Sequence, residues 1–178
     1  MNRIDLENPE QPKVKIGLET HVQLNTHSKI FCGCRNPAGL AEEPEPNTLC
    51  CETCLGMPGS KPRANESVLH AALKVALALS FSIAEETYFS RKTYFYPDMS
   101  KNFQISQYEI PLASKGHVDI SIDGKAKRIS LRRLHMEEDP AKLVHVGGLG
   151  GKYVLVDYNR SGIPLIEIVT DPDFTSPE

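Results

Sequence analysis

Two closely spaced cysteine pairs constrain this chain more than any other feature of its sequence. Cys32 and Cys34 form a C-x-C pair, and after sixteen intervening residues Cys51 and Cys54 form a C-x-x-C pair. Both pairs lie in residues 32–62, which are rich in Pro, Gly and Asn and have too few apolar residues for a core of their own. Four thiolates on two turns suit tetrahedral Zn²⁺, and metal binding would supply the folding energy that this segment lacks. The segment is therefore predicted to be a loop-rich excursion built around structural zinc.

Two other interpretations of the cysteines stay open. They could be four reduced thiols, or the C-x-x-C pair could be redox-active, although no thioredoxin-like βαβ pattern surrounds it. A site closed by four cysteines would have no open position for catalysis. Cys50 is left over and is expected to take no part.

The bulk composition is that of an ordinary globular domain. Of the 178 residues, 40% are apolar and 24% are charged, which is enough for one domain with a sizeable core. The net charge of −3 lacks the basic footprint of a nucleic-acid-binding protein. If RNA is a substrate, this chain is expected to meet only its charged end. No apolar run is long enough for a membrane span and the N-terminus lacks a secretory signal, so a cytoplasmic location is predicted. In that compartment cysteines more often bind metals or stay reduced than form disulfides.

The ends of the chain differ from its middle. Residues 1–13 are polar and are predicted to be a flexible leader, with the folded domain occupying residues 14–178. At the other end Ser176 is a plausible N-cap and Pro177 the first residue of a helix. Because that helix would begin where the chain stops, we expect a piece of a longer protein.

The alternation of apolar and polar residues predicts most of the secondary structure. Residues 14–24 alternate as a half-buried strand, which places Glu19 and His21 together on its exposed face. Asn65 is a plausible N-cap for a helix over residues 66–81, which is apolar nearly all round and should be buried against a sheet.

The second half of the chain is predicted to be mostly β-structure. Residues 88–108 hold seven of the twelve Phe and Tyr side chains among charged residues, and are interpreted as a pocket-lining loop with short strands. From Val118 onward strands follow, with a turn at Asp123-Gly124, and a final hairpin is predicted across residues 158–162. The fold class is therefore α+β, with a largely antiparallel sheet and one buried helix.

Acidic and imidazole side chains gather near the ends of several predicted strands. A carboxylate cluster with histidine and oxygen ligands suits Mg²⁺, which often bridges nucleotide phosphates. Residues 159–162 and Lys101 could contact phosphate, but the sequence has no Walker motif and no G-x-G-x-x-G, so any ATP site is of another kind. A solvated strand end and a surface Glu-x-His pair are the alternatives. The cluster comprises Glu19, His21, His135, Glu137, Glu138, Asp139, Asp157, Asn159 and Glu167.

Longer blocks of sequence resemble the B subunits of the aspartyl/glutamyl-tRNA amidotransferases. The blocks are IGLETHVQL from Ile16, KIFCGC from Lys29, CETCLGMPG from Cys51, YFYPDMSKNFQISQY from Tyr94, and LHMEEDPAK and VDYNRSGIPLIEIVTDPD near the end. They cover residues 14–173 in the order expected for that family. Thr20 replaces a common Ile. Family members also continue into a helical region and a small tail domain that this chain lacks.

The resemblance implies a fold, a reaction and a set of roles. The fold would be the N-terminal part of a catalytic cradle similar to glutamine synthetase and guanidino kinases. The enzyme would use ATP to convert the side-chain carboxylate of mischarged Glu-tRNA(Gln) or Asp-tRNA(Asn) into an acyl phosphate. Ammonia from an amidase A subunit would then displace phosphate, in a heterotrimer that also includes a small C subunit. Glu19, His21, Glu137 and Glu138 match positions implicated in Mg²⁺ binding.

The remaining candidate residues are expectations within that scheme. Glu137, Glu138, Arg160 and Lys101 are the candidate catalytic residues. Contacts to the cofactor ATP are expected from Asp157, Asn159, Ser161 and Glu167, and the ammonia path or the substrate is expected to contact Tyr96, Asp98, Gln104 and Gln107.

Two alternative functions are open at this stage. One is the related archaeal E-type subunit, which acts on Glu-tRNA and generally carries a large inserted domain. The other is a zinc-stabilised RNA-binding or assembly module without catalysis, whose expected basic face is missing here.

Overall fold

The structure is a computed structural model that describes residues 14–147, 151 and 153–176. The predicted leader (1–13) and the helix start predicted at Pro177 lie outside these residues. In chain order the described elements are β1 (Glu19–Gln23), α1 (Glu66–Ala78), β2 (Ser82–Ile83), β3 (Ser90–Thr93), β4 (Phe103–Ser106), β5 (Ala113–Ile122), β6 (Lys125–Glu138), β7 (Lys142–Val146), β8 (Tyr153–Asp157) and β9 (Pro164–Thr170).

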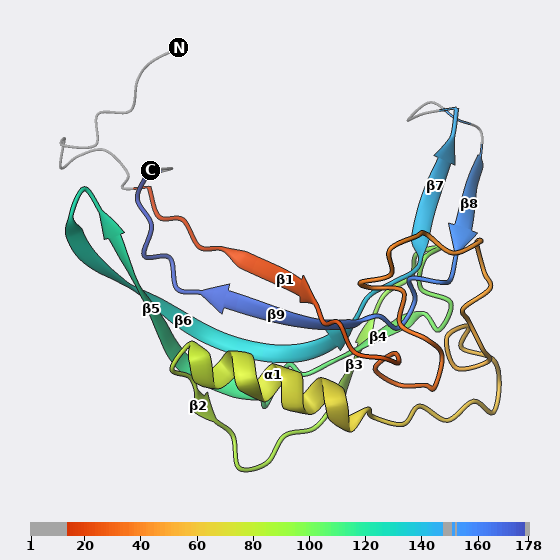
Figure 1. Ribbon diagram of the computed structural model, residues 1–178, viewed down its shortest axis with the longest axis horizontal. Coiled ribbons are helices and arrows are strands. Elements are labelled where there is room, and N and C mark those ends of the chain that lie inside the picture. The colour runs from red at the N-terminus through yellow and green to blue at the C-terminus, as the bar shows by residue number, and fades with distance from the viewer. Residues whose placement is uncertain (1–13, 148–150, 152, 177–178) are drawn as a thin grey trace.

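A five-stranded antiparallel sheet forms the body of the molecule. Its strand order is β1-β9-β6-β5-β2, and α1 lies across one of its faces (Figure 1). Two further antiparallel pairs, β3–β4 and β7–β8, lie at the end of the sheet where β6 ends and β9 begins. The predicted α+β class with a largely antiparallel sheet is confirmed.

The long β5–β6 hairpin follows from its turn residues. Asp123 and Gly124 have φ angles of 50° and 75°, the left-handed conformations that a two-residue hairpin turn requires. Ile122 pairs with Lys125 directly across the turn. The turn predicted at Asp123-Gly124 is therefore confirmed.

The hairpin predicted across residues 158–162 is wrong. β8 pairs with β7, whereas β9 enters the five-stranded sheet between β1 and β6. The turn between them carries the chain from one sheet to the other. Alternating sequence predicts that β8 and β9 are strands, but it does not determine which partners they choose.

The helix is buried on one side only. The side chain of Asn65 accepts a hydrogen bond from the Ser67 N–H at 2.9 Å, which confirms the predicted N-cap. Val68, Ala72 and Ala76 are fully buried in the core, but Leu77 is 66% exposed. The helix thus packs on the sheet as predicted, and part of its apolar surface is exposed on the other side.

The first strand is shorter than the predicted range of residues 14–24 and lies at the edge of the sheet. All five of its residues are exposed, and the neighbouring apolar face is not covered, since Leu18 and Val22 are 48% and 38% exposed. The prediction of a half-buried strand is therefore wrong about burial, because α1 covers the central strands and does not reach this edge.

The two faces of the sheet differ in chemistry. On the face under α1, Leu134 and Met136 of β6 and Ile166 of β9 pack with the helix in the hydrophobic core. Successive residues of a strand alternate between faces, so the neighbours of these residues point to the opposite side. Polar members of that opposite face form the candidate site. Within the described residues, no helix is both long and apolar enough to cross a membrane.

Candidate active site and cysteine site

Strand register assembles an acidic and imidazole cluster on the sheet face opposite α1. Glu167 of the central strand β9 lies directly across from His21 of β1 and from His135 of β6. Residues paired in this way share a face, and Glu137 joins them because it lies two residues beyond His135. Three strands that are far apart in sequence thus bring four titratable side chains together.

The two carboxylates of this cluster are buried between the two histidines. His21 Nε2 lies 3.0 Å from Glu137 Oε1 and 3.4 Å from Glu167 Oε2. His135 Nε2 lies 3.5 Å from Glu137 Oε2 and 3.3 Å from Glu167 Oε2. Ligand atoms of His21, Glu137 and Glu167 all lie within 4.8 Å of one another. The side chain of His21 is 47% exposed, so the cluster is open to solvent from that side.

The histidines control the ionisation of Glu137. Burial raises the pKa of this carboxyl, but the hydrogen bond with His135 and the charges of His135, His21 and Lys92 together lower it by more. The net pKa of Glu137 therefore lies below its ordinary value of 4.5. A carboxylate that stays ionised while buried is suited to binding a cation.

The four residues predicted to bind magnesium do not form one group. Glu137 and His21 come together, with Glu167 as their third member, and Glu19 lines the adjoining cavity. Glu138 points to the other face of the sheet, because neighbouring strand residues alternate. There it pairs with Lys101 and accepts a hydrogen bond from the Ile105 N–H at 2.9 Å.

The Lys101–Glu138 pair is buried and lies apart from the cluster. The two side chains are 9% and 4% exposed. Burial raises the pKa of Glu138, although the ammonium of Lys101 acts in the opposite direction. Both residues were predicted to be catalytic. In the structure Lys101, on the segment between β3 and β4, pairs with Glu138 at the end of β6, so the pair joins that segment to the sheet.

A cavity of about 390 Å³ adjoins the acidic cluster. His135, Glu137 and Glu167 line it together with the cationic side chains of Arg91, Lys92 and Arg133. Sequence reasoning missed these three cations. The alternation of β6 could have indicated Arg133, because it lies two residues before His135 and therefore on the same face. The sequence of β3 offers no comparable pattern for the other two.

Three residues predicted to contact ATP instead hold the cysteine-bearing loop. Asp157 accepts a hydrogen bond from the Asn47 N–H at 2.9 Å, and Ser161 donates to the Cys54 carbonyl at 3.0 Å. Asn159 accepts from the Leu49 N–H and donates to the Glu45 carbonyl, both at 2.7 Å. Asp157, Asn159 and Ser161 are all less than 10% exposed. Their polar groups are thus used within the protein, and their contact with ATP stays a prediction.

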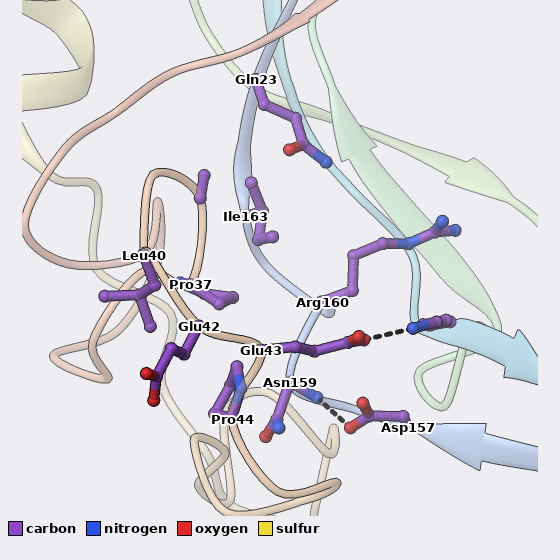
Figure 2. A pocket seen from close by; sticks show the side chains of 12 residues that line it. Gln23, Pro37, Leu40, Glu42, Glu43, Pro44, Asp157, Asn159, Arg160 and Ile163 are labelled. Atoms are coloured by element: carbon purple, nitrogen blue, oxygen red, sulfur yellow. Dashed lines mark hydrogen bonds and ion pairs between the residues drawn. The ribbon is translucent and has the colours of Figure 1, made fainter.

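Arg160 lies beside a second cavity, of about 290 Å³. Its Nε donates to the Pro140 carbonyl at 2.8 Å and lies 3.5 Å from Asp139 Oδ1. Figure 2 shows this cavity between the loop around Leu40 and the segment that carries Arg160. The Arg160 side chain is 38% exposed, so it remains accessible to a ligand.

The four residues predicted for an ammonia path or substrate contact do not share one environment. Gln107 is fully buried, accepts from the Met136 N–H and donates to Thr87, so it supports the core. Gln104 lines a cavity with His21 and Glu137 and donates to the Glu138 carbonyl at 2.8 Å. Asp98 is buried, whereas Tyr96 is 53% exposed.

The four predicted zinc ligands lie together at the other site. The sulfur atoms of Cys32, Cys34, Cys51 and Cys54 are all within 4.8 Å of one another. Four thiolates around one zinc ion would be about 3.8 Å apart, given Zn–S bonds of about 2.3 Å in a tetrahedron. Cys32 and Cys54 are 3.5 Å apart, and Cys51 and Cys54 are 3.9 Å apart. The donor set therefore fits structural zinc.

The surroundings of Cys54 favour its thiolate. The hydrogen bond from Cys32 is the main influence, and the ammonium of Lys29 adds to it, so the pKa of Cys54 falls to about 4. Residues 32–62, all of which the structure describes, form turns and bends with one β-bridge, between Ser28 and Arg35, at their start. This segment depends on its polar contacts and its cysteines, as its composition predicts.

The fold and the site together define an antiparallel α+β domain with a buried acidic and imidazole cluster beside cationic side chains. The chain is more closely defined by its relatives. Residues 14–178 match the family described as the GatB/GatE catalytic domain, and the chain belongs to this family.

Curated relatives come from several organisms. The chain is 54% identical to the B subunit of the aspartyl/glutamyl-tRNA(Asn/Gln) amidotransferase of Frankia casuarinae, over 92% of this chain and 32% of that protein. It is 54% identical to the protein of the same name from Haloquadratum walsbyi, over 91% of this chain and 32% of that protein. The relative from Methanosarcina acetivorans is 53% identical, over 97% of this chain and 34% of that protein. The chain thus spans about a third of the length of these relatives.

Proposed function

We propose that this chain is the catalytic portion of an ATP-dependent amidotransferase that acts on mischarged tRNA. The substrates would be Glu-tRNA(Gln), Asp-tRNA(Asn) or both. The reaction transfers the γ-phosphoryl group of ATP to the side-chain carboxylate, and neutral ammonia then displaces phosphate to give the amide. The cluster of His21, Glu137 and Glu167 beside a cation-lined cavity is the observation that carries this proposal.

The acidic cluster fits a divalent cation with oxygen ligands. Two carboxylates and one imidazole converge there, and water could complete an octahedral shell around Mg²⁺. When bound, the ion would neutralise charge on the transferring phosphoryl oxygens. His135 contacts both carboxylates, so it keeps them oriented toward the site.

The cationic side chains that line the cavity supply positive charge beside the carboxylates. Arg91, Lys92 and Arg133 are suited to bind the phosphate oxygens of ATP, because guanidinium and ammonium groups form charge-assisted hydrogen bonds with them. Glu19 lies on the same face of β1 as His21 and lines the same cavity, where it could add a carboxylate to the cation site. We assign the phosphate contacts to these cations because Asp157, Asn159 and Ser161 already use their hydrogen-bonding groups within the protein.

Ammonia has to reach the acyl phosphate as an unprotonated nucleophile. Gln104 lies beside His21 and Glu137 in a neighbouring cavity, and we assign to it a contact with ammonia or with the aminoacyl group. A protein path that excludes water would keep the amine neutral and protect the acyl phosphate from hydrolysis. Tyr96 and Asp98 lie on the segment before β4 and remain candidates for the same path.

The second site is proposed to hold structural Zn²⁺ on Cys32, Cys34, Cys51 and Cys54. The sulfur geometry supports it, and so does the position of the loop, which packs on the turn after β8. The metal would fix this loop and supply the folding energy that its composition does not provide. Cys50 is not part of the cluster.

The remaining parts of the assembly follow from the same proposal. The relatives are named as B subunits of a tRNA amidotransferase, which favours partners of the A and C type, a tRNA substrate, and a B-type over an E-type subunit. A likeness to glutamine synthetase and guanidino kinases stays a prediction. The alternative of a non-catalytic RNA-binding or assembly module is disfavoured, because it leaves the buried acidic cluster without a purpose.

The proposal is tested by turnover with ammonium as the nitrogen donor. The full-length protein with its partners would convert Glu-tRNA to Gln-tRNA with ATP, and Glu137→Gln should lower this turnover by roughly 100-fold or more. Glu85→Gln is the matched control, because Glu85 is exposed and follows β2, the strand at the edge of the sheet opposite β1. Turnover by Glu137→Gln at the wild-type rate, with an intact fold, would remove the cluster from the phosphoryl step.

A further inference from the structure

Lys29 is a lysine with no exposed surface, which is unusual for a charged side chain. Its ammonium donates to the Leu49 carbonyl at 2.7 Å, to Cys54 Sγ at 3.4 Å and to the Tyr158 carbonyl at 3.4 Å. An ammonium has three N–H donors, and each can serve one of these acceptors. The side chain is therefore held in one position inside the protein.

The charge of this lysine complements the cysteine site. Four thiolates around Zn²⁺ carry a net charge of about −2, and burying such a charge is costly unless it is paired or hydrogen-bonded. Cys54 is the most buried of the four cysteines and receives the hydrogen bond from Lys29. A cation at this position would offset part of that negative charge.

The same residue also joins the cysteine site to the turn between β8 and β9. The Lys29 N–H donates to the Cys34 carbonyl at 3.0 Å, while its ammonium reaches the Tyr158 carbonyl. Its aliphatic chain lies beside Gly162, where an added Cβ would be 3.6 Å from Lys29 Cδ. Lys29 thus contacts both cysteine pairs and the turn that carries Arg160.

We propose that Lys29 is a positioning residue that balances the charge of the four-cysteine site and fixes that site against the turn at residues 158–162. This inference rests on the proposed zinc site. It predicts that zinc affinity depends on Lys29 as well as on the four cysteine ligands. Hydrogen-bond partners of metal ligands commonly influence metal affinity in this way.

The test is zinc affinity of the full-length protein, measured by competition with a chromophoric chelator. Lys29→Met retains the aliphatic chain and removes the charge, and it should weaken zinc binding by about 10- to 100-fold. Lys61→Met is the matched control, because Lys61 is exposed and lies close to the cysteines in sequence. It should bind zinc as the wild type does. Amide exchange at residues 158–162 should rise in Lys29→Met alone.

The outcomes separate this inference from the zinc proposal. Wild-type protein that binds no zinc would overturn the zinc site itself. Wild-type protein that binds one zinc ion, together with a Lys29→Met variant of equal affinity, would overturn only the role of Lys29. If Lys29→Met does not fold at saturating zinc, Lys29→Gln decides in its place, since it keeps a hydrogen-bond donor without the charge. Wild-type affinity in that variant would also overturn the role.

Discussion

Asn159 provides a sharp test of how the cysteine-bearing loop is held. Its side chain is buried, and it is the partner of two backbone groups of the loop, the Leu49 N–H and the Glu45 carbonyl, each at 2.7 Å. Asn159→Ala leaves both groups without their partner. Each loss at a part-buried position should cost about 1–2 kcal/mol, so the loop should open more easily by about 2–4 kcal/mol.

The expected effect is measured by amide hydrogen exchange on the full-length protein. A change of about 2–4 kcal/mol corresponds to roughly 30- to 900-fold faster exchange in peptides that cover residues 45–54. Asn25→Ala is the control, since Asn25 is exposed, and it should leave exchange in this segment unchanged. If Asn159→Ala left the loop protected but raised the KM for ATP, Asn159 would be the nucleotide contact that the sequence suggested, and the structural role would be refuted.

Two further predictions concern the core and the cysteines. Gly116→Ala should lower the free energy of unfolding by about 1–3 kcal/mol in urea titrations, because an added Cβ would lie 2.6 Å from the ring of Phe81. Gly17→Ala is the control and should cost less, because its added Cβ would make only ordinary van der Waals contacts. Equal losses in the two variants would refute the packing argument. In the zinc-loaded protein, alkylation mapped by mass spectrometry should modify Cys50, whereas Cys32 and Cys54 should react only after a chelator has removed the zinc. Modification of Cys54 before the zinc is removed would contradict a closed metal site.

Much of the fold could be predicted from local sequence. The helix start at Asn65 and the turn at Asp123-Gly124 both formed as expected, because each depends on the chemistry of a few adjacent residues. The cysteine cluster could be predicted as well. The segment has no hydrophobic core of its own, so a metal bound by two short-spaced cysteine pairs is one of few ways to stabilise it.

Pairing between distant segments was the main source of error. The hairpin predicted between β8 and β9 failed because alternation defines a strand but not its neighbour. The same limit affected the candidate site. Asp157, Asn159 and Ser161 are polar residues at or beside a turn, and the sequence could not indicate that the distant loop at residues 45–54 uses their hydrogen-bonding groups.

The sequence by itself therefore determined most of the elements, the four clustered cysteines and the presence of carboxylates suited to a cation. Only the tertiary structure decided which of those carboxylates act together. Glu137 and Glu138 are adjacent in sequence, yet one joins His21 and Glu167 while the other pairs with Lys101. The physical reason is the pleat of β6, which sends neighbouring side chains to opposite faces, combined with a strand register that no local pattern encodes.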